Sequence, residues 1–315
     1  LILNPMVVMQ FMTEITSKND FRSGFVAVIG RPNVGKSTLI NVLLKQKIAA
    51  VSPRPQTTRR QQLGILTTEK AQIIFVDTPG FHSPRHKLGE KMVATALAAI
   101  EDADALLLIL DSSEPLTNED ELLIQRIKPY VSENQKPLIV ALNKIDLIQP
   151  EDLKTVIHHI KEIIPQGELI PISSTHGDNL DVLLDHLTQL LPISEPLYPE
   201  EQLTDLSERE IAADLIREAA LNILRDEVPH GIAVRIDQYQ EKGEGAAVIF
   251  ATIIVERESH KGIVIGANGN MIKRIGIQAR QEIEAMSGRK VYLNLKVKVQ
   301  KNWRKDENLL KWLGY

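Results

Sequence analysis

Residues 30–37 read Gly30-Arg31-Pro32-Asn33-Val34-Gly35-Lys36-Ser37, and they lie between an apolar segment, Phe25–Ile29, and a helical stretch that begins at Thr38. This strand, loop and helix setting predicts a loop that binds phosphate. Glycine at two positions lets the backbone turn its N–H groups toward an anion, Lys36 reaches the phosphate oxygens, and the Ser37 hydroxyl is suited to ligate Mg²⁺. The alternative is an ordinary glycine turn, and the motifs that follow argue against it.

A second polar motif, Asp77-Thr78-Pro79-Gly80, ends the apolar segment Ile73–Val76. At this position a nucleotide-binding protein needs a carboxylate that faces Mg²⁺ and a glycine whose N–H meets the γ-phosphate. Between the two motifs lies the polar segment Arg54-Pro55-Gln56-Thr57-Thr58-Arg59-Arg60, in which a threonine is expected to complete the Mg²⁺ coordination. We prefer Thr58, while the sequence leaves Thr57 open.

A third motif, Asn143-Lys144-Ile145-Asp146, closes the apolar segment Leu138–Leu142 and is predicted to select the base. The Asp146 carboxylate can accept hydrogen bonds from N1–H and from the exocyclic amine of guanine, two donors that adenine does not present together. Asn143 is expected to serve guanine N7 and the adjacent loop, and the Lys144 stem to lie against the base. Backbone N–H groups at Ser173 and Ser174 are expected to meet guanine O6. Together with the phosphate loop, this motif favours a guanine nucleotide over an ordinary polar turn.

The composition of the chain limits the class of protein to which it can belong. Its 315 residues predict two domains, and the absence of cysteine excludes disulfides and thiolate metal sites and favours a reducing cytosol. Residues 257–311 hold 13 basic and five acidic residues, a net charge of +8, whereas the remaining residues have a net charge of −12. A basic segment on an acidic body indicates a polyanionic partner for that segment, most often a nucleic acid.

From Phe25 to about Leu191, apolar segments alternate with amphipathic helical stretches. This alternation predicts an α/β fold with a doubly wound sheet that contains the P-loop at residues 30–37, with the ligand loops at the carboxyl ends of the strands. We expect helices that begin near Ser37, Leu88, Asn118, Asp152 and Asn179, and strands at Phe25–Ile29, Gln62–Thr67, Gln72–Val76, Ala105–Leu110, Leu138–Leu142 and Leu169–Ile172.

A proline-rich stretch, Pro192–Pro199, ends this pattern and marks a domain boundary. Beyond it a capping box, Ser207–Glu210, opens a helix, and two strands, a glycine loop, a second long helix and the alternating strand Val291–Val299 follow. This order predicts a smaller α+β domain. We set the boundaries at 1–22 for a flexible N-terminal tail, 23–191 for the first domain, 192–203 for the linker, and 204–315 for the second domain with its basic tail.

The loop Gly266-Ala267-Asn268-Gly269 follows a short apolar segment and precedes an amphipathic helix that leaves Lys273, Arg274 and Arg280 exposed. The glycines permit a sugar-phosphate backbone to approach the helix N-terminus, where the helix dipole favours anions. The last strand directs Lys296 and Lys298 outward, and the tail adds Trp303; a basic strip with an aromatic residue is typical of a groove for single-stranded nucleic acid. A solvated edge strand explains the two lysines equally well, but it does not explain the glycine loop.

These motifs in this order resemble the translation-associated GTPases, and residues 30–37 together with Gln56-Thr57-Thr58-Arg59 are similar to the Era family, whose C-terminal module is a type II KH domain. The resemblance runs from about Gly24 to the end of the chain. It implies a GTP-hydrolysing switch that binds GTP or GDP with Mg²⁺, holds the 3′ region of small-subunit ribosomal RNA, and acts in 30S subunit assembly in the cytoplasm. We expect a monomer, with a peripheral membrane contact through the basic tail as a secondary expectation.

The resemblance also bears on the reaction. Ras-like GTPases place a glutamine after D-x-x-G to orient the attacking water, whereas this chain has Phe81, as the Era-like branch does. A phenyl ring cannot hydrogen-bond water, so slow intrinsic hydrolysis is expected. Lys36, Asn33, Thr58 and Gly80 are the residues expected to act on the reaction, and the resemblance implies that Asn33 helps hold a potassium ion.

Two further readings of the sequence complete these expectations. An RNA-binding chaperone with a structural, slowly turned-over guanine nucleotide is the alternative function, and Phe81 is the feature that supports it. His82 and His86 are expected to be solvent contacts rather than bases or metal ligands.

Overall fold

The computed structural model describes residues 20–52, 54, 57–82, 84, 86–132, 136–243 and 245–315. The expected flexible tail therefore lies outside the described residues up to position 19, as do Pro55 and Gln56 of the polar segment. The first strand begins at Arg22, so the last residue assigned to the tail is part of the sheet.

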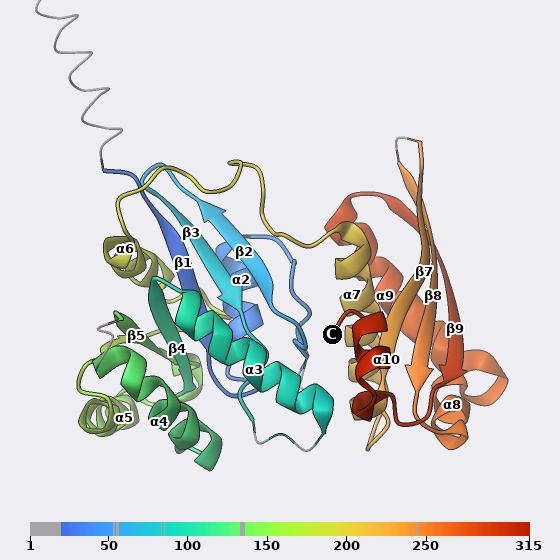
Figure 1. Cartoon of the computed structure of the whole chain (residues 1–315), viewed down its shortest axis with the longest axis horizontal. Coiled ribbons are helices and arrows are strands. Elements are labelled where there is room, and N and C mark those ends of the chain that lie inside the picture. The colour runs from blue at the N-terminus through green and yellow to red at the C-terminus, as the bar shows by residue number, and fades with distance from the viewer. Residues whose placement is uncertain are drawn as a thin grey trace, which may run out of the picture.

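The N-terminal domain, from β1 to α6, is built on a sheet with the strand order β2-β3-β1-β4-β5-β6 (Figure 1). From β3 to β6 neighbouring strands run parallel, whereas β2 pairs antiparallel with β3 at one edge. The predicted doubly wound α/β fold is confirmed, and the expected helices begin within two residues of the observed ones. The elements are β1 (Arg22–Ile29), α2 (Lys36–Leu43), β2 (Gln62–Thr67), β3 (Ala71–Asp77), α3 (Lys87–Asp102), β4 (Ala105–Asp111), α4 (Asn118–Ser132), β5 (Leu138–Asn143), α5 (Pro150–Ile163), β6 (Glu168–Pro171) and α6 (Leu180–Leu190).

Helices cover both faces of this sheet. Side chains of α2 and α6 share one apolar cluster with the strands, and side chains of α3, α4 and α5 share the other. Every residue of β3 and β4 is buried, which explains why these strands read as continuous apolar runs rather than as alternating ones. The parallel strands bring their carboxyl ends, and the loops that follow them, to one edge.

The expected linker, 192–203, is bound along the first domain. The Ser23 N–H donates to the carbonyl of Pro192, and the Gln72 side chain accepts from the N–H groups of Leu197 and Tyr198. At its end the Ile65 N–H of β2 donates to the Leu203 carbonyl over 2.8 Å. The linker is thus a structured strap at the sheet edge.

The C-terminal domain, from α7 onward, is built on a sheet with the order β7-β8-β9, in which β8 pairs antiparallel with β7 and parallel with β9. Ser207 caps α7 and forms the predicted capping box with Glu210. Side chains of α7 and α9 pack on one face of the sheet. The elements are α7 (Glu208–Ile223), β7 (Ala233–Lys242), β8 (Ala246–Val255), α8 (Glu258–Ile265), α9 (Asn270–Ser287), β9 (Lys290–Val299) and α10 (Glu307–Trp312).

One element of this domain was not predicted, and one expectation needs correction. The apolar segment before the glycine loop belongs to a helix, α8, which ends at Ile265; α8 buries only Val264, so the sequence shows no helical period there. Trp303 does not join a nucleic-acid groove. Its ring is fully buried and its indole N–H donates to the Gly231 carbonyl.

The two domains meet along α7 and α10, and α10 lies between them (Figure 1). Leu88 and Met92 of α3 pack with Ala233, Trp303 and Leu310 in one buried cluster. The helix that follows the second polar motif therefore contacts the C-terminal domain directly. Among the described residues, no helix has the length and apolar character that crossing a membrane requires.

Candidate nucleotide site and nucleic-acid interface

The loop between β1 and α2 forms the floor of a pocket. Gly30 and Gly35 adopt φ angles of 156° and 106°, and Gly35 is the N-cap of α2. A Cβ atom at Gly30 would lie 2.6 Å from the Ile109 carbonyl oxygen, so the close approach of two backbone segments requires glycine there. Asn33 also has a positive φ, 67°, and lies exposed at the rim.

Lys36 lies inside this loop. Its Nζ donates to the carbonyls of Gly30 and Arg31, each over 2.9 Å, and only 6% of the residue is exposed. Burial lowers the pKa of Lys36 to about 8, and the negative charge of Asp77 opposes that shift. The ammonium is therefore held, poorly solvated, where an anion would stabilise it.

Three oxygen-bearing side chains meet beside Lys36. The Ser37 hydroxyl donates to Asp77 Oδ2 over 2.8 Å and lies 2.9 Å from the Thr58 hydroxyl, which is 3.4 Å from the same carboxylate oxygen. Gln62 also donates to this oxygen, a partner that the sequence analysis did not identify. Asp77 is fully buried, burial raises its pKa, and among the described residues its Oδ1 has no hydrogen-bond partner. This donor set suits Mg²⁺, which prefers oxygen ligands.

The structure separates the two adjacent threonines. Thr57 Oγ1 donates to the Arg54 carbonyl over 2.8 Å and so points away from the carboxylate, whereas the Thr58 hydroxyl lies beside Ser37. The geometry thus favours Thr58 as the residue that faces a metal ion.

At the other end of the pocket, Asn143 connects three loops. Its amide nitrogen donates to the Val34 carbonyl over 2.7 Å, and its carbonyl oxygen accepts from the N–H and the hydroxyl of Ser174, both over 2.9 Å. Asp146 accepts from the Ser173 hydroxyl over 2.6 Å. The structure therefore brings the residues expected to bind guanine together, with Asn143 bracing the loops that would hold the base.

Two predicted residues turn toward a charge network beside the pocket. The Arg31 guanidinium pairs with Asp120 over 3.0 Å and with Glu114, so only the backbone of Arg31 belongs to the phosphate loop. Lys144, at φ 68°, donates to Asp111 Oδ2 over 2.5 Å. Burial alone would raise the pKa of Asp111, but the hydrogen bonds from Lys144 and Ser113 lower it below its usual value.

The segment after Asp77 packs into the protein. Thr78 donates its hydroxyl to the Val28 carbonyl, and a Cβ atom at Gly80 would lie 2.7 Å from the Pro32 nitrogen. The Phe81 ring is buried in the apolar cluster that contains α3. Against expectation, His82 is also buried, and its Nδ1 lies 2.8 Å from the Gly80 carbonyl oxygen. His86 caps α3, where it accepts from the Gly89 N–H.

These groups enclose a pocket of about 350 Å³. It is lined from three directions, by the phosphate loop, by the polar segment around Thr58, and by Gly80 and Lys144. The predicted residues that line it are Pro32, Asn33, Gly35, Lys36, Ser37, Thr58, Gly80 and Lys144. Among the other predicted residues, Gly30, Val34, Asp77, Pro79, Asn143 and Asp146 are not part of this lining.

The second predicted loop, residues 266–269, lies between α8 and α9. Gly266, Asn268 and Gly269 all have positive φ angles, between 52° and 75°. A Cβ atom at Gly266 would lie 2.6 Å from Met271 Cβ, whereas one at Gly269 would meet nothing within 4 Å. Gly269 is the N-cap of α9 and no side chain caps it, so this end of the helix is open to an approaching backbone.

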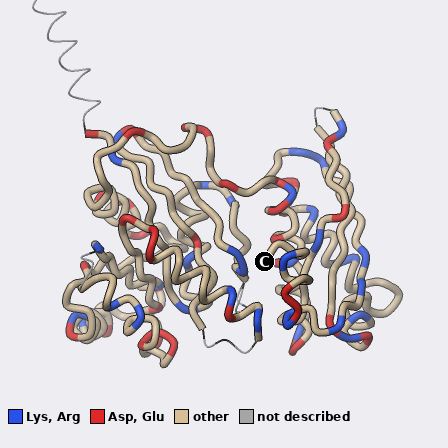
Figure 2. The backbone as a smooth tube through the Cα atoms, viewed as in Figure 1, with Lys and Arg blue, Asp and Glu red and all other residues tan. Residues whose placement is uncertain are grey.

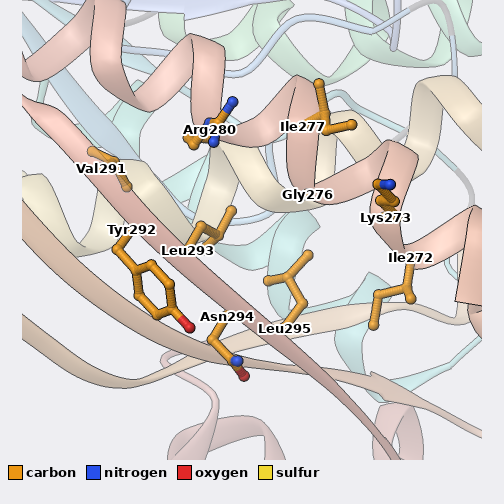
Figure 3. Close-up of a pocket in the computed structure, with 10 residues that line it drawn as sticks. All are labelled: Ile272, Lys273, Gly276, Ile277, Arg280, Val291, Tyr292, Leu293, Asn294 and Leu295. Carbon is orange, nitrogen blue, oxygen red and sulfur yellow. The ribbon is translucent and has the colours of Figure 1, made fainter.

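A groove runs beside this loop between α9 and β9, with a volume of about 330 Å³ (Figure 3). Lys273 and Arg280 of the predicted residues line it. Tyr292 of β9, which is 60% exposed, also lines it. Arg274, Lys296 and Lys298 are exposed but do not line the groove. Figure 2 shows Lys and Arg recurring along the C-terminal domain. The sequence analysis missed Tyr292, although an aromatic residue among the outward positions of the last strand was a usable signal.

Comparisons with known proteins agree with this geometry. Residues 25–144 match the family of 50S ribosome-binding GTPases, and residues 227–304 match the KH domain. GTPase Era of Lacticaseibacillus paracasei is 46% identical over 297 residues, which cover 94% of this chain and 98% of the relative. The chain belongs to the Era family of GTPases. The sequence-based resemblance is thereby confirmed.

Solved structures of Era align with nearly the whole chain. A crystal structure of Era in complex with MgGDPNP and nucleotides 1506–1542 of 16S ribosomal RNA is 42% identical, covers 94% of this chain and 99% of its own, and gives a TM-score of 0.89. Aquifex aeolicus Era bound to GDP and AlF4⁻ is 41% identical with the same coverage and a TM-score of 0.88. The fold of this chain is thus the Era fold from the first sheet to the KH domain.

Proposed function

We propose that this Era-family chain binds GTP with Mg²⁺ in the pocket, hydrolyses it to GDP, and holds the 3′ region of small-subunit ribosomal RNA through its KH domain during 30S subunit assembly. The observation that carries the first part is the meeting of Ser37, Thr58 and Asp77 beside Lys36. The observation that carries the second is the open loop 266–269 next to a groove with basic and aromatic lining. Related Era structures with MgGDPNP and 16S ribosomal RNA support both parts.

The residues of the pocket have different roles, which follow from the chemistry of their side chains. Lys36 and the backbone N–H groups of residues 33–37 bind the β- and γ-phosphates, while Ser37, Thr58 and Asp77 hold the metal. Mg²⁺, when bound, supplies positive charge to the phosphate oxygens. Asp146 reads the guanine edge, and Gly80 meets the γ-phosphate through its N–H. Asn33, at the exposed rim, helps to hold a potassium ion, and equal GTPase rates in potassium and sodium buffers would remove that role.

Two measurements test this function. Calorimetry is expected to show GTP and GDP bound far more tightly than ATP, because adenine does not offer Asp146 its pair of donors. Filter binding of 16S ribosomal RNA fragments is expected to separate GTP-loaded, GDP-loaded and nucleotide-free protein. Equal affinity for ATP and GTP would overturn the nucleotide assignment, and equal RNA affinity in all three states would overturn the switch.

A second candidate function rests on Phe81. Its ring is 8% exposed and packs in the core, so position 81 offers no group that orients water. A chaperone that binds RNA and keeps its guanine nucleotide as a structural element would show the same feature. Single-turnover hydrolysis decides between the two: acceleration by RNA favours the switch, and an unchanged slow rate with and without RNA favours the chaperone.

We propose that the chain acts in the cytoplasm as a monomer, with a peripheral contact to the inner face of the cell membrane as a secondary site. The composition without cysteine supports the compartment, and the basic residues near the C-terminal end support the membrane contact. Sedimentation velocity checks the monomer. Flotation with vesicles of anionic lipid checks the membrane contact, and neutral vesicles are its control.

A further inference from the structure

The polar segment that carries Thr58 lies along helix α7 of the C-terminal domain. Just before it, the Val51 N–H donates to Glu218 over 3.0 Å, and the Ser52 hydroxyl donates to Asn222 over 2.8 Å. At its end, Arg60 pairs with Asp214 over 3.0 Å and with Glu210 over 3.2 Å. The described residues of this segment thus follow α7 in the opposite direction, and a helix of one domain supplies the partners for a loop of the other.

Two buried arginines fix the backbone on either side of Thr58. Arg217 of α7 donates through Nη2 to the carbonyl of Thr57, which belongs to the peptide bond that precedes Thr58. Arg59, the next residue after Thr58, donates to the carbonyls of Ile232 and His230 over 2.6 Å and 3.1 Å. Its guanidinium also lies 5.6 Å from the centre of the Trp303 ring. Thr58 is therefore held between two contacts, each of which joins its segment to a residue of the C-terminal domain.

The burial of these two arginines costs desolvation free energy. Arg217 is 1% exposed and Arg59 is 5% exposed, and burial lowers the pKa of Arg59 to about 10. Removing a guanidinium from water is unfavourable unless its hydrogen bonds compensate. Both guanidinium groups donate hydrogen bonds to backbone carbonyls. These bonds therefore define the path of the backbone through Thr57, Thr58 and Arg59.

We infer that Arg217 is a positioning residue for the Thr58 hydroxyl, so that the C-terminal domain sets one metal-facing group of the nucleotide pocket. The inference rests on the proposed function, in which Thr58 completes the Mg²⁺ coordination only when a γ-phosphate is present. Ser37 and Asp77 lie on α2 and β3, within the N-terminal domain, so these elements rather than α7 set their positions. The docking of α7 therefore affects the triphosphate state and leaves the diphosphate state unchanged.

The test compares two nucleotides in the full chain at a fixed Mg²⁺ concentration. Arg217→Gln removes the charged donor to the Thr57 carbonyl, and the dissociation constants of fluorescent GDPNP and GDP are measured by titration. We expect the GDPNP dissociation constant to rise about tenfold, the usual effect of losing one hydrogen bond from a charged donor, and the GDP constant to stay within about twofold.

Arg209→Gln is the matched control. Arg209 lies on the same helix and donates to the Ile236 carbonyl within the C-terminal domain, so its loss is expected to change neither nucleotide affinity. An equal loss of GDP and GDPNP affinity in Arg217→Gln, or no loss of either, would overturn the inference. Failure of the unsubstituted chain to bind GDPNP and GDP would instead overturn the proposed function, so the two failures are distinct.

A second variant keeps the inference testable if Arg217→Gln does not fold, which loss of its thermal unfolding transition would show. Arg60→Gln removes the ion pairs with Asp214 and Glu210 at the end of the same contact and changes neither domain core. It is expected to weaken GDPNP binding in preference to GDP binding, by a smaller factor. An equal effect of Arg60→Gln on both nucleotides would contradict the role of α7.

Discussion

The nucleotide pocket and the groove between α9 and β9 are built in opposite ways. In the pocket, Lys36 and Asp77 are buried and already hydrogen-bonded to neighbouring groups before a ligand arrives. In the groove, Lys273, Arg280 and Tyr292 are exposed, and the open end of α9 is capped by no side chain in the described structure. The first design concentrates binding in a few preorganised groups, whereas the second distributes it over many weak ones.

The largest expected effect follows from removing the buried ammonium of the pocket. Lys36→Ala is expected to lower single-turnover GTP hydrolysis by about two to three orders of magnitude, because the charge that faces the phosphates is lost from a desolvated site. Stopped reactions analysed for GDP measure the rate. Lys273→Ala is the control with an exposed lysine and should hydrolyse GTP normally; an unchanged rate in Lys36→Ala would break the comparison.

A smaller effect is expected in the groove. Tyr292→Ala removes an aromatic surface on which a base can stack, and we expect RNA affinity to fall by about 1 to 3 kcal/mol, measured by filter binding. GTP hydrolysis without RNA should not change, because β9 lies far along the chain from the pocket and lines none of it. Tyr239→Phe, outside the groove, is the control, and a loss of affinity there equal to that of Tyr292→Ala would refute the assignment.

The pH dependence of nucleotide binding sharpens the comparison further. Burial lowers the pKa of Lys36 to about 8 from its ordinary 10.5, and bound phosphate favours the charged form, so binding above that pH takes up a proton. We expect GDP affinity to fall up to about tenfold for each pH unit above about 8, and to change little with pH near 7, where Lys36 is already protonated before GDP binds. Calorimetry in buffers of different ionisation heat measures the proton uptake, and equal uptake near pH 7 and near pH 9 would contradict it.

The smallest expected effect concerns one exposed charge of the groove. Lys273→Ala should reduce the slope of the logarithm of RNA affinity against the logarithm of salt concentration by about one, because one phosphate contact is lost. The same measurement on Lys161→Ala, a lysine of α5 in the other domain, should leave the slope unchanged. A slope that is identical in all three proteins would exclude Lys273 from the interface.

The sequence predicted the residues of the pocket better than those of the groove, because the pocket loops are positioned by the strands next to them in the chain. Residues 30–37, Asp77 and Asn143 follow directly on buried strands, so the sheet itself brings their loops together. The choice between Thr57 and Thr58 was left open because it depends on contacts with a helix more than a hundred residues later. The direction of the Arg31 side chain was not predictable either, since its partner Asp120 lies on α4.

Prediction was less complete in the C-terminal domain, because the surroundings of some side chains there depend on how the two domains meet. Trp303 was expected among the basic residues of a groove. Instead it lies in the interface between the two domains, where its ring contacts Arg59 and its indole N–H donates to the Gly231 carbonyl. Tyr292 was missed, because its role depends on the position of β9 at the sheet edge, which brings the ring to the groove beside α9.

The strap between the domains determines where the molecule can bend. Ile65 of β2 holds the Leu203 carbonyl, the Leu63 N–H donates to the Asp205 carboxylate over 2.8 Å, and the cap of α7 begins at Ser207. In the continuous described stretch 136–243, Leu206 alone separates the last attachment of one domain from the first cap of the other. A swing of the KH domain about Leu206 would therefore have to break the contacts of α7 with Ser52 and Arg60, and a larger displacement would also have to separate the strap from β2.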